Sequence, residues 1–224
     1  EICACLVGSE MCIRDRDYAI QPKKGFPDHY DGQILVPFSP EAILSGVERQ
    51  LQPGEYLWYR RLLPVDEMDL FNGSRLILHF GAIDYEADIF LNGNKVTSHS
   101  GGYLPIDCDI TDFLEKGENE LTVRVSDPSD AGFQSRGKQI LKRGGIFYTA
   151  QSGIWQTVWL ERVPENYIES LTVTPDYDAR TVTVRVHTTK PGGAVNVWAA
   201  VRAGGVTIAE DWGSDEADQD GEVT

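Results

Sequence analysis

The sequence is short of positive charge. It contains 20 Lys and Arg residues against 35 Asp and Glu residues, which gives a formal net charge of −15 at pH 7. Proteins that bind nucleic acid gather Lys and Arg on one face, where these side chains contact phosphates. The charge balance therefore argues against a nucleic-acid partner.

Long apolar runs are also missing. No stretch approaches the roughly 20 apolar residues that a membrane-spanning helix needs, so no membrane partner is expected. Residues 1–16 lack the basic segment followed by an apolar segment that marks a secretory signal peptide. The location, cytoplasmic or secreted, is left open.

Cysteine is scarce and clustered at one end. Cys3, Cys5 and Cys12 precede the region with a folded pattern, and only Cys108 lies within it. This distribution predicts no disulfide framework. Because no Cys or His pair at ligand spacing accompanies Cys3 and Cys5, we predict no metal site there. No cofactor is expected.

The first sixteen residues show neither the alternation of a strand nor the pattern of a capped helix. The run from Ser9 to Arg16 resembles translated sequencing-adapter sequence. We therefore predict a non-native or disordered leader over residues 1–16 and exclude it from the fold.

From Asp17 onward, apolar residues recur at every second position. Apolar residues alternate along three segments, at Leu76, Leu78 and Phe80, at Ala87, Ile89 and Leu91, and at Leu121, Val123 and Val125. Such alternation is typical of half-buried strands. Asn92 and Gly93 suit a tight hairpin turn, and a single helical turn is expected at Ile110–Leu114. We predict an all-β fold in which residues 17–163 form an antiparallel jelly-roll sandwich.

A polar linker that contains Pro164 precedes a second set of short apolar strands. Leu171 and Val173, followed by Val182 and Val184, recur at the spacing of an immunoglobulin-like sandwich. Residues 164–224 supply about 60 of the roughly 100 residues of such a domain. We therefore predict a partial immunoglobulin-like β-sandwich over residues 164–224.

Nine short blocks, in this order, resemble the sugar-binding domain of family 2 glycoside hydrolases, the β-galactosidase and β-glucuronidase group. They are Val36–Glu41, Leu44–Gly46, Trp58–Arg61, Phe80–Ala87, Leu91–Gly93, Gly101–Tyr103, Asp127–Asp130, Arg136–Gln139 and Ser152–Glu161. The resemblance implies a galactose-binding-like jelly roll over residues 17–163 and the start of the immunoglobulin-like domain after it. One departure is the opening strand, where only Tyr18–Ile20 remains of a pattern that usually contains Trp.

The resemblance implies the non-catalytic front part of a β-glycosidase that hydrolyses O-glycosidic bonds. In such an enzyme the catalytic carboxylates lie on a barrel of about 250 residues, and the strand and helix alternation of a barrel is absent here. We expect no catalytic residue and no activity from this chain alone. Its expected partner is a carbohydrate substrate shared with the missing barrel, and a homo-oligomer of the full-length enzyme is left open.

Two other function classes remain open at this point. Jelly-roll sandwiches often bind sugars by themselves, so the chain is alternatively an autonomous carbohydrate-binding module without hydrolase activity. The third class is a purely structural or interaction domain.

Two aspartates are the strongest candidates for sugar binding. Asp84 and Asp127 each lie where a strand gives way to a loop, and the resemblance implies that both approach the sugar pocket. A carboxylate that accepts hydrogen bonds from sugar hydroxyls is a common specificity device. The predicted substrate-binding set is completed by Asp130, Arg136, Lys138 and Gln139, of which Lys138 and Gln139 are expected to order the loop or to form an interface.

Other candidates have structural readings beside the functional ones. Trp58, Trp155 and Trp159 lie in strand patterns, which favours core packing over stacking on sugar rings. Arg60 and Arg61 either clamp an anionic substrate or form structural ion pairs. His79 faces away from the apolar side of its strand, so an edge or surface position is expected.

Overall fold

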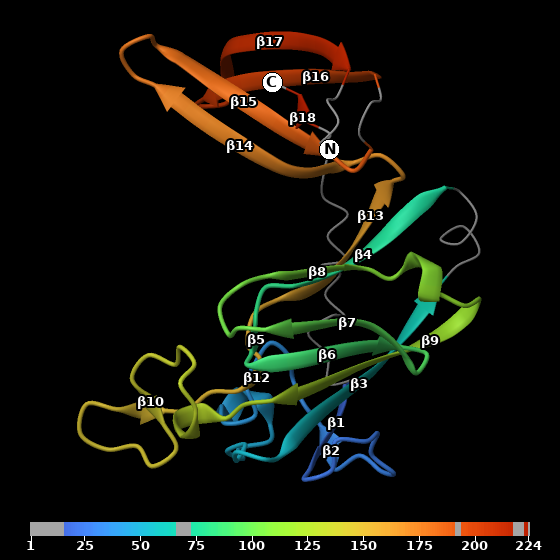
Figure 1. Ribbon diagram of the computed structural model, residues 1–224, viewed down its shortest axis with the longest axis vertical. Coiled ribbons are helices and arrows are strands. Elements are labelled where there is room, and N and C mark those ends of the chain that lie inside the picture. Colours follow the sequence, from blue (N-terminus) through green and yellow to red (C-terminus); the bar gives the residue numbers. More distant parts are fainter. Residues whose placement is uncertain (1–15, 66–72, 191–193, 217–221, 224) are drawn as a thin grey trace. The chain divides into compact units, whose positions relative to one another are not determined.

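The computed structural model describes residues 16–65, 73–190, 194–216 and 222–223 (Figure 1). Contacts divide the chain into two compact units, Glu1–Arg162 and Val163–Thr224. Helical structure among the described residues is limited to three short 3-10 turns, η1 (Ile43–Ser45), η2 (Thr111–Phe113) and η3 (Ser129–Ala131). Within the same ranges no helix has the length and apolar character needed to cross a bilayer. The prediction of an all-β fold is confirmed.

The first unit is a sandwich of two main sheets (Figure 1). The larger sheet has the strand order β2 (Gly32–Gln33), β1 (Asp17–Gln21), β3 (Tyr56–Val65), β9 (Gly117–Ser126), β6 (Glu86–Leu91) and β7 (Asn94–Ser100). The smaller sheet has the order β13 (Val158–Pro164), β4 (Ser74–Phe80) and β8 (Ile106–Asp109). Neighbouring strands of the larger sheet are antiparallel, as expected for a jelly roll.

The core lies between these sheets and is built from the predicted alternation. Leu78 and Phe80 of β4 face Ile89 of β6 and Val123 of β9, and all four are buried in one cluster. Burial of each such side chain stabilises the fold by about 1.5 to 3 kcal/mol. A smaller cluster of Ala19, Trp58 and Phe90 forms separately from this core, so Trp58 packs inside the protein as expected.

The hairpin between β6 and β7 forms at the predicted turn. Asn92 and Gly93 have φ values of 51° and 77°, the left-handed conformation that a two-residue hairpin turn requires. Asn92 also donates from its side chain to the Asn119 side chain at 2.8 Å. This contact ties the hairpin to the start of β9.

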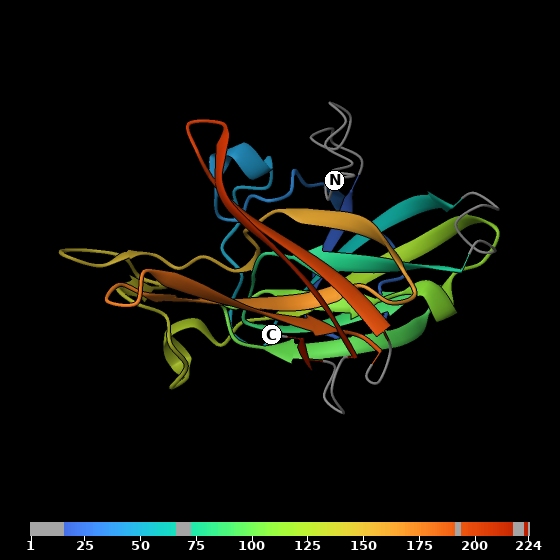
Figure 2. The same ribbon diagram turned by 90° about the horizontal axis from the view of Figure 1, so that it is seen from above.

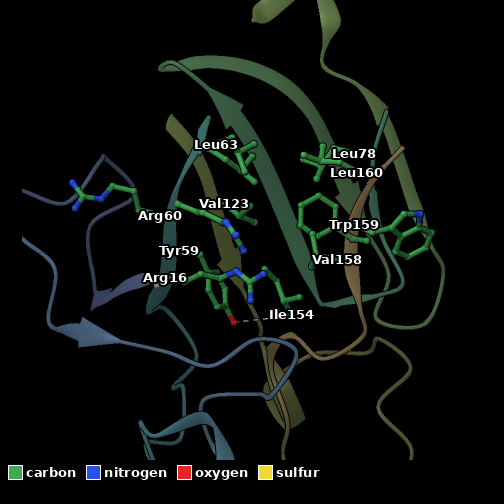
Figure 3. Close-up of a pocket in the computed structure, with 13 residues that line it drawn as sticks. Arg16, Tyr59, Arg60, Leu63, Leu78, Val123, Ile154, Val158, Trp159 and Leu160 are labelled. Carbon is green, nitrogen blue, oxygen red and sulfur yellow. Dashed lines mark hydrogen bonds between the residues drawn. The ribbon is translucent and has the colours of Figure 1, made fainter. Parts of the chain in front are cut away.

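A cavity of about 40 Å³ lies inside the sandwich (Figure 3). Side chains of both sheets line it, among them Leu63, Leu78 and Val158, together with Arg16. The Tyr59 hydroxyl at this cavity accepts a hydrogen bond from the Ile154 amide at 3.1 Å. The lining is mostly apolar and contains no carboxylate, and we interpret the cavity as a packing gap.

Of the predicted leader, only Arg16 is described. Its carbonyl accepts a hydrogen bond from the Ile34 amide at 2.9 Å, and its guanidinium donates to the Val36 carbonyl at 3.3 Å. Arg16 is therefore part of the packed unit. Residues 1–15, including the three clustered cysteines, lie outside the described residues, and a leader there stays a prediction.

The second unit consists of strand hairpins. One sheet contains β14 (Ile168–Asp176), β15 (Thr181–Thr188) and β18 (Glu222–Val223), and the other contains β16 (Ala194–Ala203) and β17 (Val206–Glu216) (Figure 2). Val186 is buried, whereas Leu171, Val173 and Val182 are exposed. The unit is all-β as expected, and its assignment as a partial immunoglobulin-like sandwich stays a prediction.

We predict that Asn119→Ala destabilises the first unit by about 3 kcal/mol, because burying unpaired polar groups costs about 1 to 3 kcal/mol each. Asn119 is fully buried. Its side-chain oxygen accepts a hydrogen bond from the Glu115 amide at 2.7 Å, and its side-chain nitrogen donates to the carbonyls of Glu115 at 2.7 Å and Gly117 at 3.1 Å. Native-state hydrogen exchange of β3 and β9 amides measures the change. Asn94→Ala, at the exposed first residue of β7, is the matched control, and equal effects of both substitutions would contradict the prediction.

Candidate functional site

Asp84 and Asp127 come together at one end of the first unit. Asp84 belongs to β5 (Ile83–Asp84), which pairs with β12 (Gly153–Ile154) so that Asp84 lies opposite Gly153. Asp127 directly follows β9. Both residues are well covered, since Asp84 is only 7% exposed and Asp127 only 6%.

The carboxylate of Asp84 is held in an unfavourable environment. Burial, reinforced by the negative charges of Asp127 and Glu41, raises the pKa of Asp84 to about 7. No hydrogen-bond donor among the described residues reaches this carboxylate, and a side chain at Gly102 would have its Cβ 2.6 Å from Asp84 Oδ1. A buried acceptor without a donor is ready to bind an incoming hydroxyl group.

Asp127 is anchored more firmly. Its Oδ1 accepts a hydrogen bond from the Ser129 amide at 2.7 Å, and Ser129 has a φ of 49° in the left-handed region. Burial raises the pKa of Asp127, while the bonds from Ser129 and Gln134 act in the opposite direction. Asp127 therefore stabilises the turn at η3 in addition to lying beside Asp84.

Glu41 is a third carboxylate at this end of the sandwich. It accepts hydrogen bonds from the Ser152 hydroxyl at 2.7 Å, the Ser152 amide at 3.1 Å and the Leu51 amide at 3.0 Å. Burial raises the pKa of Glu41. Since both of its oxygens are engaged, Glu41 acts mainly as a structural tie whose charge is felt by Asp84.

Two exposed aromatic residues border the carboxylates. The rings of Tyr103 and Trp155 meet edge to face with centroids 6.1 Å apart, and they are 49% and 36% exposed. Burial, and then the charges of Asp84 and Asp127, raise the pKa of Tyr103, and Tyr103 directly follows Gly102, which lies against the Asp84 carboxylate. The Trp155 ring N–H donates to the Gly102 carbonyl at 2.8 Å. Trp155 therefore lies at the site, and the prediction that it packs in the core is wrong.

The other predicted site residues lie on the following loops. Asp130 is exposed, and its carboxylate accepts a long hydrogen bond of 3.4 Å from the Leu141 amide. Arg136, Lys138 and Gln139 line a separate open groove. Candidates for sugar binding are thus divided between an acidic site at Asp84 and Asp127 and a groove lined by cationic residues.

Two other candidate residues, Arg60 and His79, have carboxylate partners in the structure. Arg60 forms an ion pair with Asp17, with Nε at 3.0 Å from the carboxylate. His79 lies between Asp107 at 2.6 Å and Glu161 at 3.1 Å. Neither side chain belongs to the site around Asp84.

The site combines buried carboxylates with exposed aromatic rings. Carboxylates accept hydrogen bonds from hydroxyl groups, and aromatic rings cover the apolar face of a ligand. Within the described ranges no group of three or more His, Cys, Asp or Glu side chains is arranged to hold a metal ion. The arrangement is suited to binding a polyhydroxylated molecule.

A jelly-roll sandwich with hydroxyl acceptors and aromatic rings at one end defines a galactose-binding-like domain. The family model described as the glycosyl hydrolase 2 galactose-binding domain-like family matches residues 39–156. The chain belongs to this family, and the predicted resemblance is confirmed.

Curated relatives are glycosidases much longer than this chain. A β-galactosidase of Thermoanaerobacter pseudethanolicus is 29% identical over 116 residues, which is 51% of this chain and 14% of the relative. A β-glucuronidase of Canis lupus familiaris is 28% identical over 155 residues, covering 61% of this chain and 24% of the relative. The chain therefore spans less than a third of either relative.

Solved structures show the same fold. The Bifidobacterium dentium β-glucuronidase, solved with coumarin-3-O-glucuronide, has a TM-score of 0.65 and 21% identity, and the match covers 90% of this chain and 38% of that one. At this identity the likeness establishes the fold alone.

Sequence reasoning missed Glu41, Gly102 and Tyr103 as site residues. All three lie in blocks that carry the family resemblance, Val36–Glu41 and Gly101–Tyr103. That signal was available, but nothing in the local pattern indicates that these blocks meet Asp84.

We predict that Asp84→Asn stabilises the chain at pH 8 and has little effect at pH 4. The pKa of Asp84 rises from 3.8 to about 7 on folding, so its ionisation destabilises the folded state progressively between these pH values. Asparagine carries no charge and avoids this loss. The difference in Tm between variant and parent, measured across the range, should grow up to about pH 7 and then level off. Asp130→Asn, at an exposed position, serves as control, and a lower Tm for Asp84→Asn at pH 8 would contradict the prediction.

A second prediction separates the two roles of Asp127. Asp127→Ala should lower stability by about 1 kcal/mol, because it removes the acceptor for the Ser129 amide. Asp127→Asn keeps a side-chain oxygen for that amide and should retain most of the stability. Urea denaturation compares the two variants, and equal losses would show that the turn does not depend on this acceptor.

Proposed function

We propose that this chain is the non-catalytic part of a longer family 2 β-glycosidase that hydrolyses O-glycosidic bonds. The observation that carries the proposal is the family match together with the small share of each glycosidase relative that the chain spans. The carbohydrate substrate would then be shared between this chain and a catalytic domain elsewhere in the protein, and the chain alone would be inactive.

Within that enzyme, Asp84 is assigned to sugar recognition. Its carboxylate lacks a donor among the described residues and lies near the exposed Tyr103. A sugar hydroxyl would supply the missing hydrogen bond, and the Trp155 ring would cover an apolar face of the ligand. Asp127 shares this role through its charge and its position beside Asp84.

A second candidate function is an autonomous carbohydrate-binding module. The exposed pair Tyr103 and Trp155 beside buried carboxylates favours it, because this combination can bind a sugar without any other domain. Calorimetric titration of the isolated chain with galactose, glucuronate and mannose distinguishes the candidates. Affinity of the isolated chain for the neutral sugars, galactose or mannose, favours the module.

The main proposal predicts a kinetic effect. Sequencing of the gene beyond the codon for Thr224 would supply the full-length enzyme for this experiment. In that enzyme Asp84→Asn should lower kcat/KM for a nitrophenyl β-glycoside by about 10- to 150-fold, since a charged hydrogen bond to substrate contributes about 1.5 to 3 kcal/mol. Nitrophenyl β-galactoside, β-glucuronide and β-mannoside are the substrates to compare.

Asp112→Asn is the matched control and should keep parental kinetics, because Asp112 is exposed and lies on η2 before the start of β9, whereas Asp127 follows the end of that strand. The isolated chain should hydrolyse none of the three substrates. Unchanged kcat/KM for Asp84→Asn would remove this residue from the pocket. Turnover by the purified chain that depends on one of its own carboxylates would overturn the proposal as a whole.

A further inference from the structure

One segment reverses the charge of the rest of the protein. Residues 131–151 contain four cationic side chains, Arg136, Lys138, Lys142 and Arg143, and no Asp or Glu. The segment, called here the cationic arm, projects away from the sheets in both views (Figures 1 and 2). Among the described residues none of the four forms an ion pair with a carboxylate, although carboxylates outnumber cations in the chain.

An open groove of about 550 Å³ lies on this arm. The short parallel strands β10 (Gln139–Ile140) and β11 (Tyr148–Thr149) shape it. Its lining consists of Arg136, Gly137, Lys138, Gln139, Tyr148, Thr149 and Gln151. Every side chain in that lining carries a polar group, and two of them carry a positive charge, while carbon atoms of these side chains form most of the lining surface.

Hydrogen bonds hold the chain in place around the groove, while some of its side-chain donors remain available for a ligand. The Tyr148 amide donates to the Lys138 carbonyl at 2.8 Å, and the Gln151 amide donates to the Gln139 side chain at 2.7 Å. Arg136 uses one guanidinium nitrogen to bond the Gly132 carbonyl at 3.1 Å. The Lys138 ammonium and the remaining Arg136 donors are available, and the Tyr148 ring is 68% exposed beside them.

We propose that this groove binds the anionic group of an acidic saccharide, a uronate carboxylate or a sulfate ester, on the same glycan whose neutral hydroxyls meet Asp84. The inference rests on the proposed function for the choice of a saccharide. Paired cations recognise carboxylate and sulfate oxygens, and an exposed tyrosine ring covers the face of a sugar. A nucleic acid fits less well, because the surrounding protein is strongly acidic and repels a long polyanion.

The groove and the Asp84 site are close along the chain. Gln151 lines the groove, and Gly153, two residues later, pairs with Asp84 across β12 and β5. Two extended residues span about 7 Å. A single oligosaccharide can therefore contact both places, with its uncharged part at the carboxylates and its charged part at Arg136 and Lys138.

Titration calorimetry of the whole chain tests the proposal with oligosaccharides of equal length. The probes are an oligoglucuronide, a sulfated galactose oligosaccharide and an unsulfated galactose oligosaccharide. We expect at least one acidic probe to bind about tenfold or more tightly than the neutral one, because each charge-assisted hydrogen bond contributes about a factor of ten. The uronate and sulfate probes identify which anionic group the groove takes.

Matched variants locate the binding. The double variant Arg136→Gln with Lys138→Gln should weaken acidic binding about tenfold or more. The double variant Lys23→Gln with Lys24→Gln removes the same charge from exposed positions outside the cationic arm and should leave binding unchanged. Because Arg136 also orders the loop, Lys138→Gln and the charge-retaining Lys138→Arg are compared as well, and only the first should lose affinity.

Four results would overturn the proposal. The first two are equal affinity for the acidic and neutral probes, and no binding of either acidic probe up to about 10 mM. The third is an equal loss of affinity in both double variants. The fourth is that poly-glutamate binds as tightly as the acidic saccharides or more tightly, which would indicate an acidic protein surface as the partner. Each of these can occur while Asp84→Asn still lowers kcat/KM in the full-length enzyme. Failure of the groove and failure of the proposed function are therefore distinguishable.

Discussion

The site depends on the pairing of β12 with β5. This contact brings Gly153 opposite Asp84 and places Ser152 on Glu41. It is possible only because residue 153 is glycine, which has a φ of 78° there, and because a Cβ at that position would lie 2.2 Å from the Tyr59 hydroxyl. A side chain at this position would therefore separate β12 from the sandwich and disperse the carboxylates.

The same pairing explains how much of the molecule could be predicted from sequence. Strands such as β4, β6 and β9 and the turn at Asn92 follow from local alternation and turn chemistry, and the structure contains them where expected. The sequence predicts Trp155 within a strand, but the chain leaves β12 after Ile154 and enters β13 only at Val158. That break turns Trp155 toward Gly102 and the carboxylates.

What could not be predicted is contact between distant segments. Glu41 and Ser152 are 111 residues apart in sequence, and periodicity within a short window carries no information about such a pair. The burial of Asp84 has the same origin, because Gly102, Asp127 and Glu41 reach it from three different loops. Residues next to loops are usually exposed, so the burial of this carboxylate is visible only in the folded chain.

Charge is separated within the first unit in a way that opposes stability. Among the described residues, Asp84 is buried beside Asp127 and Glu41 without a cation, while Lys138, Lys142 and Arg143 of the arm are exposed and have no carboxylate partner there. A fold selected for stability alone would bring the two sets together, since a paired and hydrogen-bonded charge costs less to bury than an isolated one. The separation of the two sets leaves hydrogen-bond acceptors at Asp84 and Asp127 and cationic donors on the arm. This arrangement suits a ligand with both hydroxyl and anionic groups.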